Sequence, residues 1–223
     1  MTKLCIALDT DLNKAFSILD QLKEFPIVFK VGPVLFLEGG IEILEKIKSA
    51  NKELFLDLKL YDIPNTVRNA VTKAERLGVD YITLHILGGE GMLKSAVSVR
   101  KRIKLLGVTL LTSQEEELLR LVQSAIDKSE TFVLHLSKLA AKVGLDGVVC
   151  SAYEVRKVKK ETGMFCAVPG IRLYLSPEDQ RRTSSPEFAI AEGADMIILG
   201  REIYKSKDPA RIVEEIISRI NGR

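Results

Sequence analysis

Short apolar segments alternate with longer amphipathic segments along the whole chain. The segment from residue 11 to 24 repeats apolar residues at helical spacing, and Pro26 ends it. This pattern predicts eight strands, each followed by helical structure. We expect strands at residues 3–9, 27–31, 54–59, 79–85, 105–112, 145–150, 164–168 and 195–199. We expect helices at residues 11–24, 33–50 and 65–77, from the Gly88-Gly89 turn to about residue 104, then in one or two pieces up to residue 143, at 152–162, shortly after Pro186, and up to residue 220.

Strands that alternate with helices indicate parallel β/α units, which fit either a closed barrel or an open doubly wound sheet. The polar residues at the carboxyl ends of the strands favour the barrel, because a barrel brings those ends together at one mouth. We therefore predict a single (β/α)8 TIM barrel domain over residues 1–223. The polar and turn residues at these strand ends are Asp9, Lys30, Asp57, Lys59, His85, Thr112, Ser113, Pro169, Gly200 and Arg201.

The strand at residues 54–59 is the most informative segment, because charge interrupts its apolar pattern. Alternate side chains of a strand share a face, so Phe55, Asp57 and Lys59 are expected on one face and the leucines on the other, packed under helices. A buried carboxylate and ammonium cost several kcal/mol unless they are paired. A functional pair at the barrel mouth therefore explains Asp57 and Lys59 better than a surface ion pair.

Lys30 ends the neighbouring strand and would place a second ammonium beside Asp57. A Lys-Asp-Lys row holds charges in fixed positions, which suits the stabilisation of developing negative charge, and Lys59 is also a candidate general acid. Asp9 is either a helix cap or a residue that binds a hydroxyl group. Asp62 falls in the loop after the strand, before Pro64 and the next helix.

A second candidate site for an anion lies near the end of the chain. Gly200 and Arg201 follow the last strand and open a helix, and barrels commonly bind phosphate in the loops after strands seven and eight. The loop after strand seven is long, which makes it a candidate lid. It contributes Pro169, Gly170, Ile171, Arg172, Gln180, Arg181 and Arg182, although each arginine alone is also compatible with a solvated surface charge.

Composition narrows the function classes. The chain has 223 residues, is 46% hydrophobic, and carries a formal charge of +3, too small to argue for binding to nucleic acid or a membrane surface. Three scattered cysteines without Cys-x-x-Cys spacing fit reduced, structural thiols better than disulfides or a zinc site. We see no signal peptide, no membrane span, no P-loop and no dinucleotide fingerprint, and expect a soluble cytoplasmic protein. His85 could line the site or be structural, and His135 is expected to be structural.

Residues 57–67 read Asp-Leu-Lys-Leu-Tyr-Asp-Ile-Pro-Asn-Thr-Val, which resembles the signature of the orotidine 5′-monophosphate decarboxylase family. The D-x-K-x-x-D core is shared with relatives of other function, whereas the Ile-Pro-Asn-Thr extension is specific. The resemblance covers nearly the whole chain and includes Asp9 and residues 29–32, 111–113, 144–151, 169–172 and 193–201. Two departures are residues 173–176, where many relatives have Pro-x-Gly, and Tyr204.

The resemblance implies decarboxylation of orotidine 5′-monophosphate (OMP) to UMP in pyrimidine biosynthesis, without a metal or organic cofactor. It implies a homodimer in which Lys30, Asp57 and Lys59 form a charge network with Asp62 of the second subunit. Lys59 would protonate C6 of the pyrimidine. The other substrate-binding residues implied are Asp9, Lys30 and Thr66 for the ribose, Ser113 for the pyrimidine, Gln180 and Arg201 for the phosphate, and Ile63, Pro169, Arg172 and Gly200 elsewhere in the site.

Two alternatives remain open at this stage. The first is a Mg²⁺-dependent sugar-phosphate decarboxylase or aldolase of the same suprafamily, which uses a similar D-x-K-x-x-D motif. Lys30 beside Asp57 and the Ile-Pro-Asn-Thr extension argue against it. The second is a barrel that binds nucleotide without catalysis, since a fold alone does not determine function.

Overall fold

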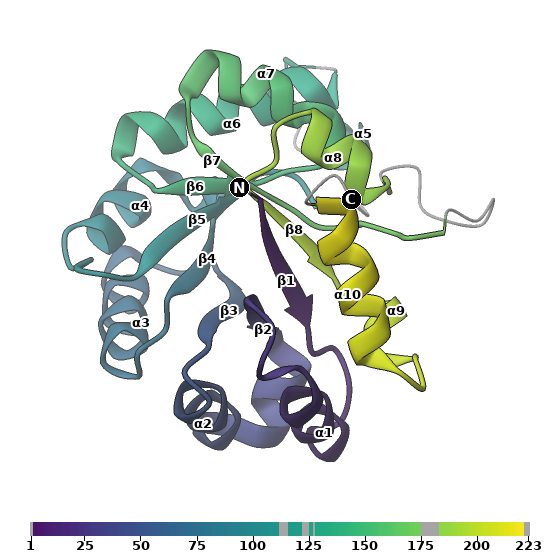
Figure 1. Cartoon of the computed structure of the whole chain (residues 1–223). Helices are drawn as coiled ribbons and strands as arrows, with labels where there is room; N and C mark the ends of the chain where they lie inside the picture. The colour runs from purple at the N-terminus through teal and green to yellow at the C-terminus, as the bar shows by residue number, and fades with distance from the viewer. Residues whose placement is uncertain (1, 112–115, 122–124, 127, 175–182, 221–223) are drawn as a thin grey trace.

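The computed structural model describes residues 2–111, 116–121, 125–126, 128–174 and 183–220. Its eight strands are all parallel and form one closed barrel in chain order, β1 pairing with β8 (Figure 1). The predicted barrel is confirmed, and the open sheet is excluded. The strands are β1 (Lys3–Ala7), β2 (Ile27–Val31), β3 (Glu53–Leu60), β4 (Tyr81–His85), β5 (Lys104–Val108), β6 (Gly147–Val149), β7 (Phe165–Val168) and β8 (Met196–Leu199).

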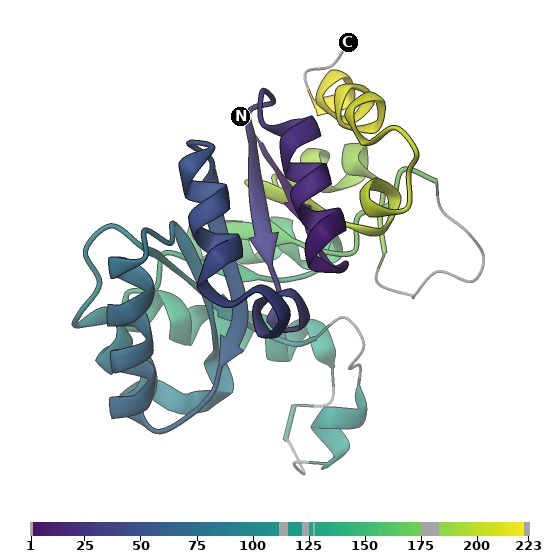
Figure 2. The same cartoon turned by 90° about the horizontal axis from the view of Figure 1, so that it is seen from below.

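Helices surround the barrel, and Figure 2 shows the start of β1 and the end of α10 at the same end of it. Among the described residues between β5 and residue 143, the structure has two helices, which agrees with the prediction of one or two helical pieces there. The helical elements are α1 (Leu12–Leu22), α2 (Pro33–Ser49), α3 (Pro64–Arg76), the 3-10 turn η1 (Ile86–Gly88), α4 (Gly89–Val97), α5 (Glu116–Leu121), α6 (Ser129–Val143), α7 (Ala152–Thr162), α8 (Pro186–Ala191), α9 (Arg201–Tyr204) and α10 (Pro209–Ile220).

The prediction that the fourth helix runs to about residue 104 is wrong, because α4 ends at Val97. The carboxylate of Glu75 at the end of α3 accepts backbone hydrogen bonds from Lys101, Arg102 and Ile103 at 3.0–3.2 Å. These N–H groups are therefore held in a loop that leads directly into β5. Burial raises the pKa of Glu75, but the three backbone hydrogen bonds outweigh it and the net pKa is lowered.

The strands separate two apolar layers. Phe55, Tyr81 and Met196 belong to a cluster inside the barrel, whereas Leu54 and Leu56 pack in the larger layer between strands and helices. The predicted alternation along β3 is therefore confirmed, and the face shared by Phe55 and Asp57 points into the barrel. The barrel interior therefore contains both an apolar cluster and, nearer the carboxyl ends of the strands, the charged groups of the site.

A Gly-x-Asp triplet leads into each of β4, β6 and β8 at the amino-terminal end of the barrel. The glycines Gly78, Gly144 and Gly193 have φ of +73°, +87° and +95°, which suits glycine and ends the preceding helix. Each aspartate then makes two hydrogen bonds to one residue of the preceding strand. In the third triplet, the backbone N–H of Asp195 donates to the carbonyl of Cys166, and the Asp195 carboxylate accepts from the N–H of Cys166 at 2.8 Å.

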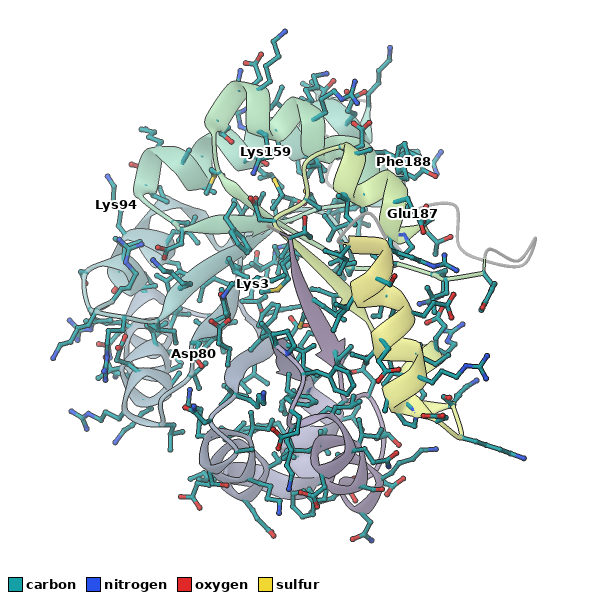
Figure 3. The ribbon with its side chains drawn as sticks, viewed as in Figure 1. Lys3, Asp80, Lys94, Lys159, Glu187 and Phe188 are labelled. Atoms are coloured by element: carbon teal, nitrogen blue, oxygen red, sulfur yellow. The ribbon has the colours of Figure 1, made fainter. Side chains whose placement is uncertain are left out.

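Asp80 and Asp146 bind Leu54 and Leu105 in the same way. Each aspartate also pairs with a cation: Lys48 at 2.7 Å from Asp80, Arg100 at 2.8 Å from Asp146, and Lys159 at 2.6 Å from Asp195. In Figure 3, Asp80 and Lys159 lie on different sides of the strand ring, with Lys3 near its centre. We call these three arrangements the Gly-x-Asp clamps. They stabilise the end of the barrel opposite to the predicted site.

No helix within the described residues is long and apolar enough to cross a membrane.

Candidate active site

Three charged side chains form a row at the carboxyl ends of β2 and β3. Asp57 Oδ2 lies 3.2 Å from Lys30 Nζ and 2.9 Å from Lys59 Nζ, so one carboxylate oxygen contacts both ammonium groups. Lys30 and Asp57 are each only 8% exposed, whereas the Lys59 side chain is 37% exposed. The predicted Lys-Asp-Lys row is thus present, with its inner two members buried and its third facing the open mouth.

The ionisation of the buried members follows from their neighbours. Burial lowers the pKa of Lys30, but the carboxylates of Asp57 and Asp9 outweigh it and raise the net pKa. Burial raises the pKa of Asp57, but the ammonium groups of Lys30 and Lys59 and the hydrogen bonds to the carboxylate outweigh it and lower the net pKa. Both residues therefore remain charged at neutral pH, and the row keeps two positive charges around one negative charge.

Asp9 extends the row on the other side of Lys30. Its Oδ1 lies 3.6 Å from Lys30 Nζ, and 52% of its side chain is exposed. Its carboxylate therefore has one side toward the row and another free to accept hydrogen bonds from hydroxyl groups of a ligand. A cap on the following helix is not its role, because Asp11 accepts the capping hydrogen bond of α1 from Lys14.

A pocket of about 350 Å³ opens over this row at the mouth of the barrel. Its walls combine the charged residues with apolar side chains of the strand ends, among them Phe55, Val149 and Ile198. This composition suits a small, polar, anionic molecule with a flat apolar part. The predicted site residues that line the pocket are Asp9, Lys30, Asp57, Lys59, Pro169, Arg172, Gly200 and Arg201.

The two loops predicted to hold an anion meet at one edge of the pocket. Gly200 packs so closely on β1 that an added Cβ would lie 3.2 Å from the Cβ of Ala7. Arg172 is largely buried, donates to the carbonyl of Ile171 and lies 3.6 Å from the carboxylate of Glu202 in α9. The base of the loop after β7 is therefore attached to the short helix that carries Arg201.

Several predicted site residues are not in this pocket. Asp62, Ile63 and Thr66 follow β3 but are exposed and do not line it, and the Asp62 carboxylate accepts from the N–H of Ile63 at 2.6 Å. Ser113 and Gln180 lie outside the described residues, as do Thr112, Arg181 and Arg182.

His85 does not line the pocket either. Its ring stacks on Tyr61 with centroids 5.7 Å apart, and its Nδ1 accepts a long hydrogen bond from the N–H of Leu87. Burial and the ammonium of Lys59 lower its pKa. Of the two readings of this histidine, the structure favours the structural one.

Sequence reasoning missed Thr183 and gave no role to Tyr204, which both line the pocket. It also missed Thr83, which is 1% exposed and binds Asp57 through its hydroxyl. The available signal was a polar residue inside an apolar strand, two positions before His85. Threonine is common in strands, so that signal is weak.

Comparisons with known proteins agree with this geometry. The family model described as "Orotidine 5'-phosphate decarboxylase / HUMPS family" matches residues 2–216. A protein named orotidine 5′-phosphate decarboxylase from Aquifex aeolicus is 40% identical, with 97% of each chain covered. One of the same name from Wolbachia pipientis subsp. Culex pipiens is 44% identical, with 99% of each chain covered.

Solved structures agree as well. The structure of orotidine 5′-phosphate decarboxylase from Lactobacillus acidophilus has a TM-score of 0.86 and 34% identity, with 99% of this chain and 100% of that chain covered. The enzyme from Methanocaldococcus jannaschii, complexed with the inhibitor BMP, has a TM-score of 0.81 and 26% identity, with 99% of each chain covered.

Proposed function

The chain belongs to the orotidine 5′-phosphate decarboxylase / HUMPS family, and we propose that it converts OMP to UMP and CO2 in pyrimidine biosynthesis. The observation that carries this proposal is the row of Lys30, Asp57 and Lys59 under a pocket of about 350 Å³. A barrel mouth with two ammonium groups around one carboxylate suits a reaction in which negative charge moves from a carboxylate to a ring carbon.

The chemistry follows from these positions. The bond between C6 of the pyrimidine and its carboxylate breaks, CO2 leaves, and the electron pair stays on C6. Lys59 lies at the open end of the row, so its ammonium stabilises that carbanion and then donates a proton to C6. Asp57 holds Lys59 in place and repels the substrate carboxylate, while Lys30 keeps Asp57 ionised.

The remaining site residues bind the parts of the substrate that do not react. We propose that Asp9 and Lys30 bind the ribose hydroxyls, and that Ser113 contacts the pyrimidine. Binding energy from the remote phosphate would help to assemble the site around the reacting ring. We assign the phosphate to Arg201 and Gln180, together with Gly200, Pro169 and Arg172 at the same edge.

A second copy of the chain would complete the site. Asp62, Ile63 and Thr66 are exposed and lie outside their own pocket, although they follow directly on the strand that carries the row. Large apolar side chains are exposed in the same β3–α3 loop and in α2, which follow the carboxyl ends of the neighbouring strands β3 and β2. Exposed apolar side chains gathered on one face mark interaction surfaces. The exposed side chains are Val34 at 73%, Leu37 at 85%, Ile41 at 50%, Tyr61 at 64% and Ile63 at 66% exposure.

We therefore propose a homodimer in which this face of each copy covers the mouth of the other, and Asp62 and Thr66 enter the partner's pocket. A symmetric dimer would bury the same apolar patch twice. We further propose that the enzyme is cytoplasmic, acts on a small molecule rather than on nucleic acid or a membrane, needs no metal or organic cofactor, and forms one domain over residues 1–223.

The test is an assay of purified protein with OMP and excess chelator, in which the ultraviolet change reports formation of UMP. Conversion in the presence of chelator would support the substrate, the reaction and independence of metal together. Turnover of a sugar phosphate with Mg²⁺, and none of OMP, would instead identify the protein as a Mg²⁺-dependent sugar-phosphate decarboxylase or aldolase. Affinity for UMP without turnover of either substrate would leave a binding protein.

A further inference from the structure

The ladder between β3 and β4 is irregular beside the charged row. Leu56 pairs with Ile82, but the next pair joins Leu60 to Leu84, so β3 uses more residues than β4 between these points. Lys59 lies within this bulge and has φ of +48°, in the left-handed region that non-glycine residues rarely adopt. Such a conformation persists only where the surroundings hold it, and it often accompanies function.

Thr83 is the β4 residue that lies opposite the bulge, between Ile82 and Leu84. Its Oγ1 accepts a hydrogen bond from the backbone N–H of Lys59 at 2.8 Å and donates to Asp57 Oδ1 at 2.8 Å. The direction of both bonds is determined, because the N–H is only a donor and the ionised carboxylate is only an acceptor. One hydroxyl therefore connects the backbone of the proposed proton donor to the carboxylate beside it.

The two oxygens of Asp57 are used separately. Oδ2 contacts the ammonium groups of Lys30 and Lys59, while Oδ1 receives the hydroxyl of Thr83. The bond to Thr83 therefore opposes rotation of the carboxylate and keeps Oδ2 directed at both lysines. Thr83 itself does not line the pocket.

We propose that Thr83 is a positioning residue, whose hydroxyl holds the left-handed backbone of Lys59 and the orientation of Asp57, and so determines where the Lys59 ammonium stands over the substrate. This role rests on the proposed function. Since Thr83 does not touch the pocket, its loss should affect the chemical step far more than substrate binding. An error of about 1 Å in the position of a reacting group is enough to cost up to about a hundredfold in rate.

The decisive variant is Thr83→Val, which keeps the shape of the side chain and removes the hydroxyl. We expect kcat for OMP to fall at least about tenfold, with KM and the Kd for UMP changed less than about threefold. Thr83→Ser keeps the hydroxyl and should restore most of kcat. The acidic limb of the kcat profile of Thr83→Val should also move to higher pH, because Asp57 loses a hydrogen bond that favours its charged form.

Ser137→Ala is the control. Ser137 is also fully buried, but its hydroxyl donates to the backbone carbonyl of Val133 within α6, and neither residue lines the pocket. This control should keep kcat near the wild-type value. If Thr83→Val does not fold, Thr83→Ala removes the same hydroxyl without adding a methyl group against the carboxylate, and the same loss of kcat is expected.

The assay of the wild-type protein distinguishes failure of the proposed function from failure of the positioning role of Thr83. An inactive wild-type protein would overturn the proposed function itself. An active wild type, with kcat of the Thr83→Val and Thr83→Ala variants equal to that of Ser137→Ala or with a loss confined to KM, would overturn the positioning role alone.

Discussion

Lys30 and Lys59 contact the same carboxylate oxygen, but they differ in exposure. The Lys30 side chain is 10% exposed and the Lys59 side chain 37% exposed. Replacement of Lys59 therefore removes an ammonium that water already reaches, and Asp57 retains Lys30 as its partner. A substitution at Lys59 should consequently reduce catalysis strongly and change the free energy of unfolding little.

We expect Lys59→Ala to reduce kcat for OMP by at least about a thousandfold, because it removes charge stabilisation and the proton donor together. Its free energy of unfolding should stay within about 1 kcal/mol of the wild type, since water reaches the Lys59 ammonium and Asp57 keeps its buried partner Lys30. Lys94→Ala, at a surface lysine paired with Glu90, serves as control for both measurements. Near-normal turnover in Lys59→Ala would contradict the proposed mechanism.

Asp57 should behave differently, since its loss leaves Lys30 buried with only Asp9, 3.6 Å away, as an anionic contact in the row. We expect Asp57→Asn to lower the free energy of unfolding by about 3 kcal/mol at pH 7, the cost typical of an unpaired buried charge. Denaturant titration measures this value, with the surface variant Glu161→Gln as control.

The pH dependence of that difference follows from the pKa of Asp57, which is lowered in the folded state. Its contribution to stability is present above the unfolded value of about 4 and is lost as pH falls through the folded value. The gap between wild type and Asp57→Asn should therefore narrow in acid. A gap that is absent at pH 7, or that widens in acid, would contradict the assigned charges.

At this scale the sequence predicted the charged row because alternation in a strand places Asp57 and Lys59 on one face. It did not predict Thr83 or the left-handed backbone of Lys59. Periodicity describes a regular strand, whereas the bulge between β3 and β4 depends on how two strands pair.

At the scale of elements, the apolar pattern predicted the strands and most helices, with shifts at their ends. The end of α4 could not be predicted, because it depends on Glu75, which is distant in sequence. The Gly-x-Asp clamps were also missed, although the triplet occurs before three strands. Their role depends on the hydrogen bonds that each aspartate makes to the preceding strand, and a local sequence pattern does not predict these bonds.

We expect Asp195→Ala to destabilise the barrel by about 1–3 kcal/mol, because the N–H of Cys166 loses its acceptor and Lys159 loses its partner. The melting temperature should fall by several degrees. The clamp lies at the end of the barrel opposite to the pocket, so kcat at low temperature should be unchanged. Asp20→Ala removes a surface aspartate paired with Lys46 at 3.7 Å and should have little effect. Equal melting temperatures for the two variants would remove the clamp's assigned role.

At the scale of the whole molecule, the polar residues at the strand ends predicted a barrel rather than an open sheet. The pocket of one chain contains the charged row but lacks Asp62 and Thr66. A sequence describes one copy, and the contacts between two copies depend on surfaces that periodicity does not report. The proposed dimer therefore comes from the resemblance to a family, and the exposed apolar side chains beside Asp62 in its own loop, Tyr61 and Ile63, support the proposal.

The most direct test of the account mixes two inactive variants, Lys59→Ala and Asp62→Ala, and measures conversion of OMP. Each alone should be nearly inactive. After exchange of subunits at equal amounts, half of the dimers are mixed, and each has one site with both residues intact, so activity should return to about one quarter of the wild-type value. Lys59→Ala mixed with Lys59→Ala/Asp62→Ala has no intact site and should stay inactive. No recovery, in a mixture shown to contain mixed dimers, would contradict a site shared between two copies of this chain.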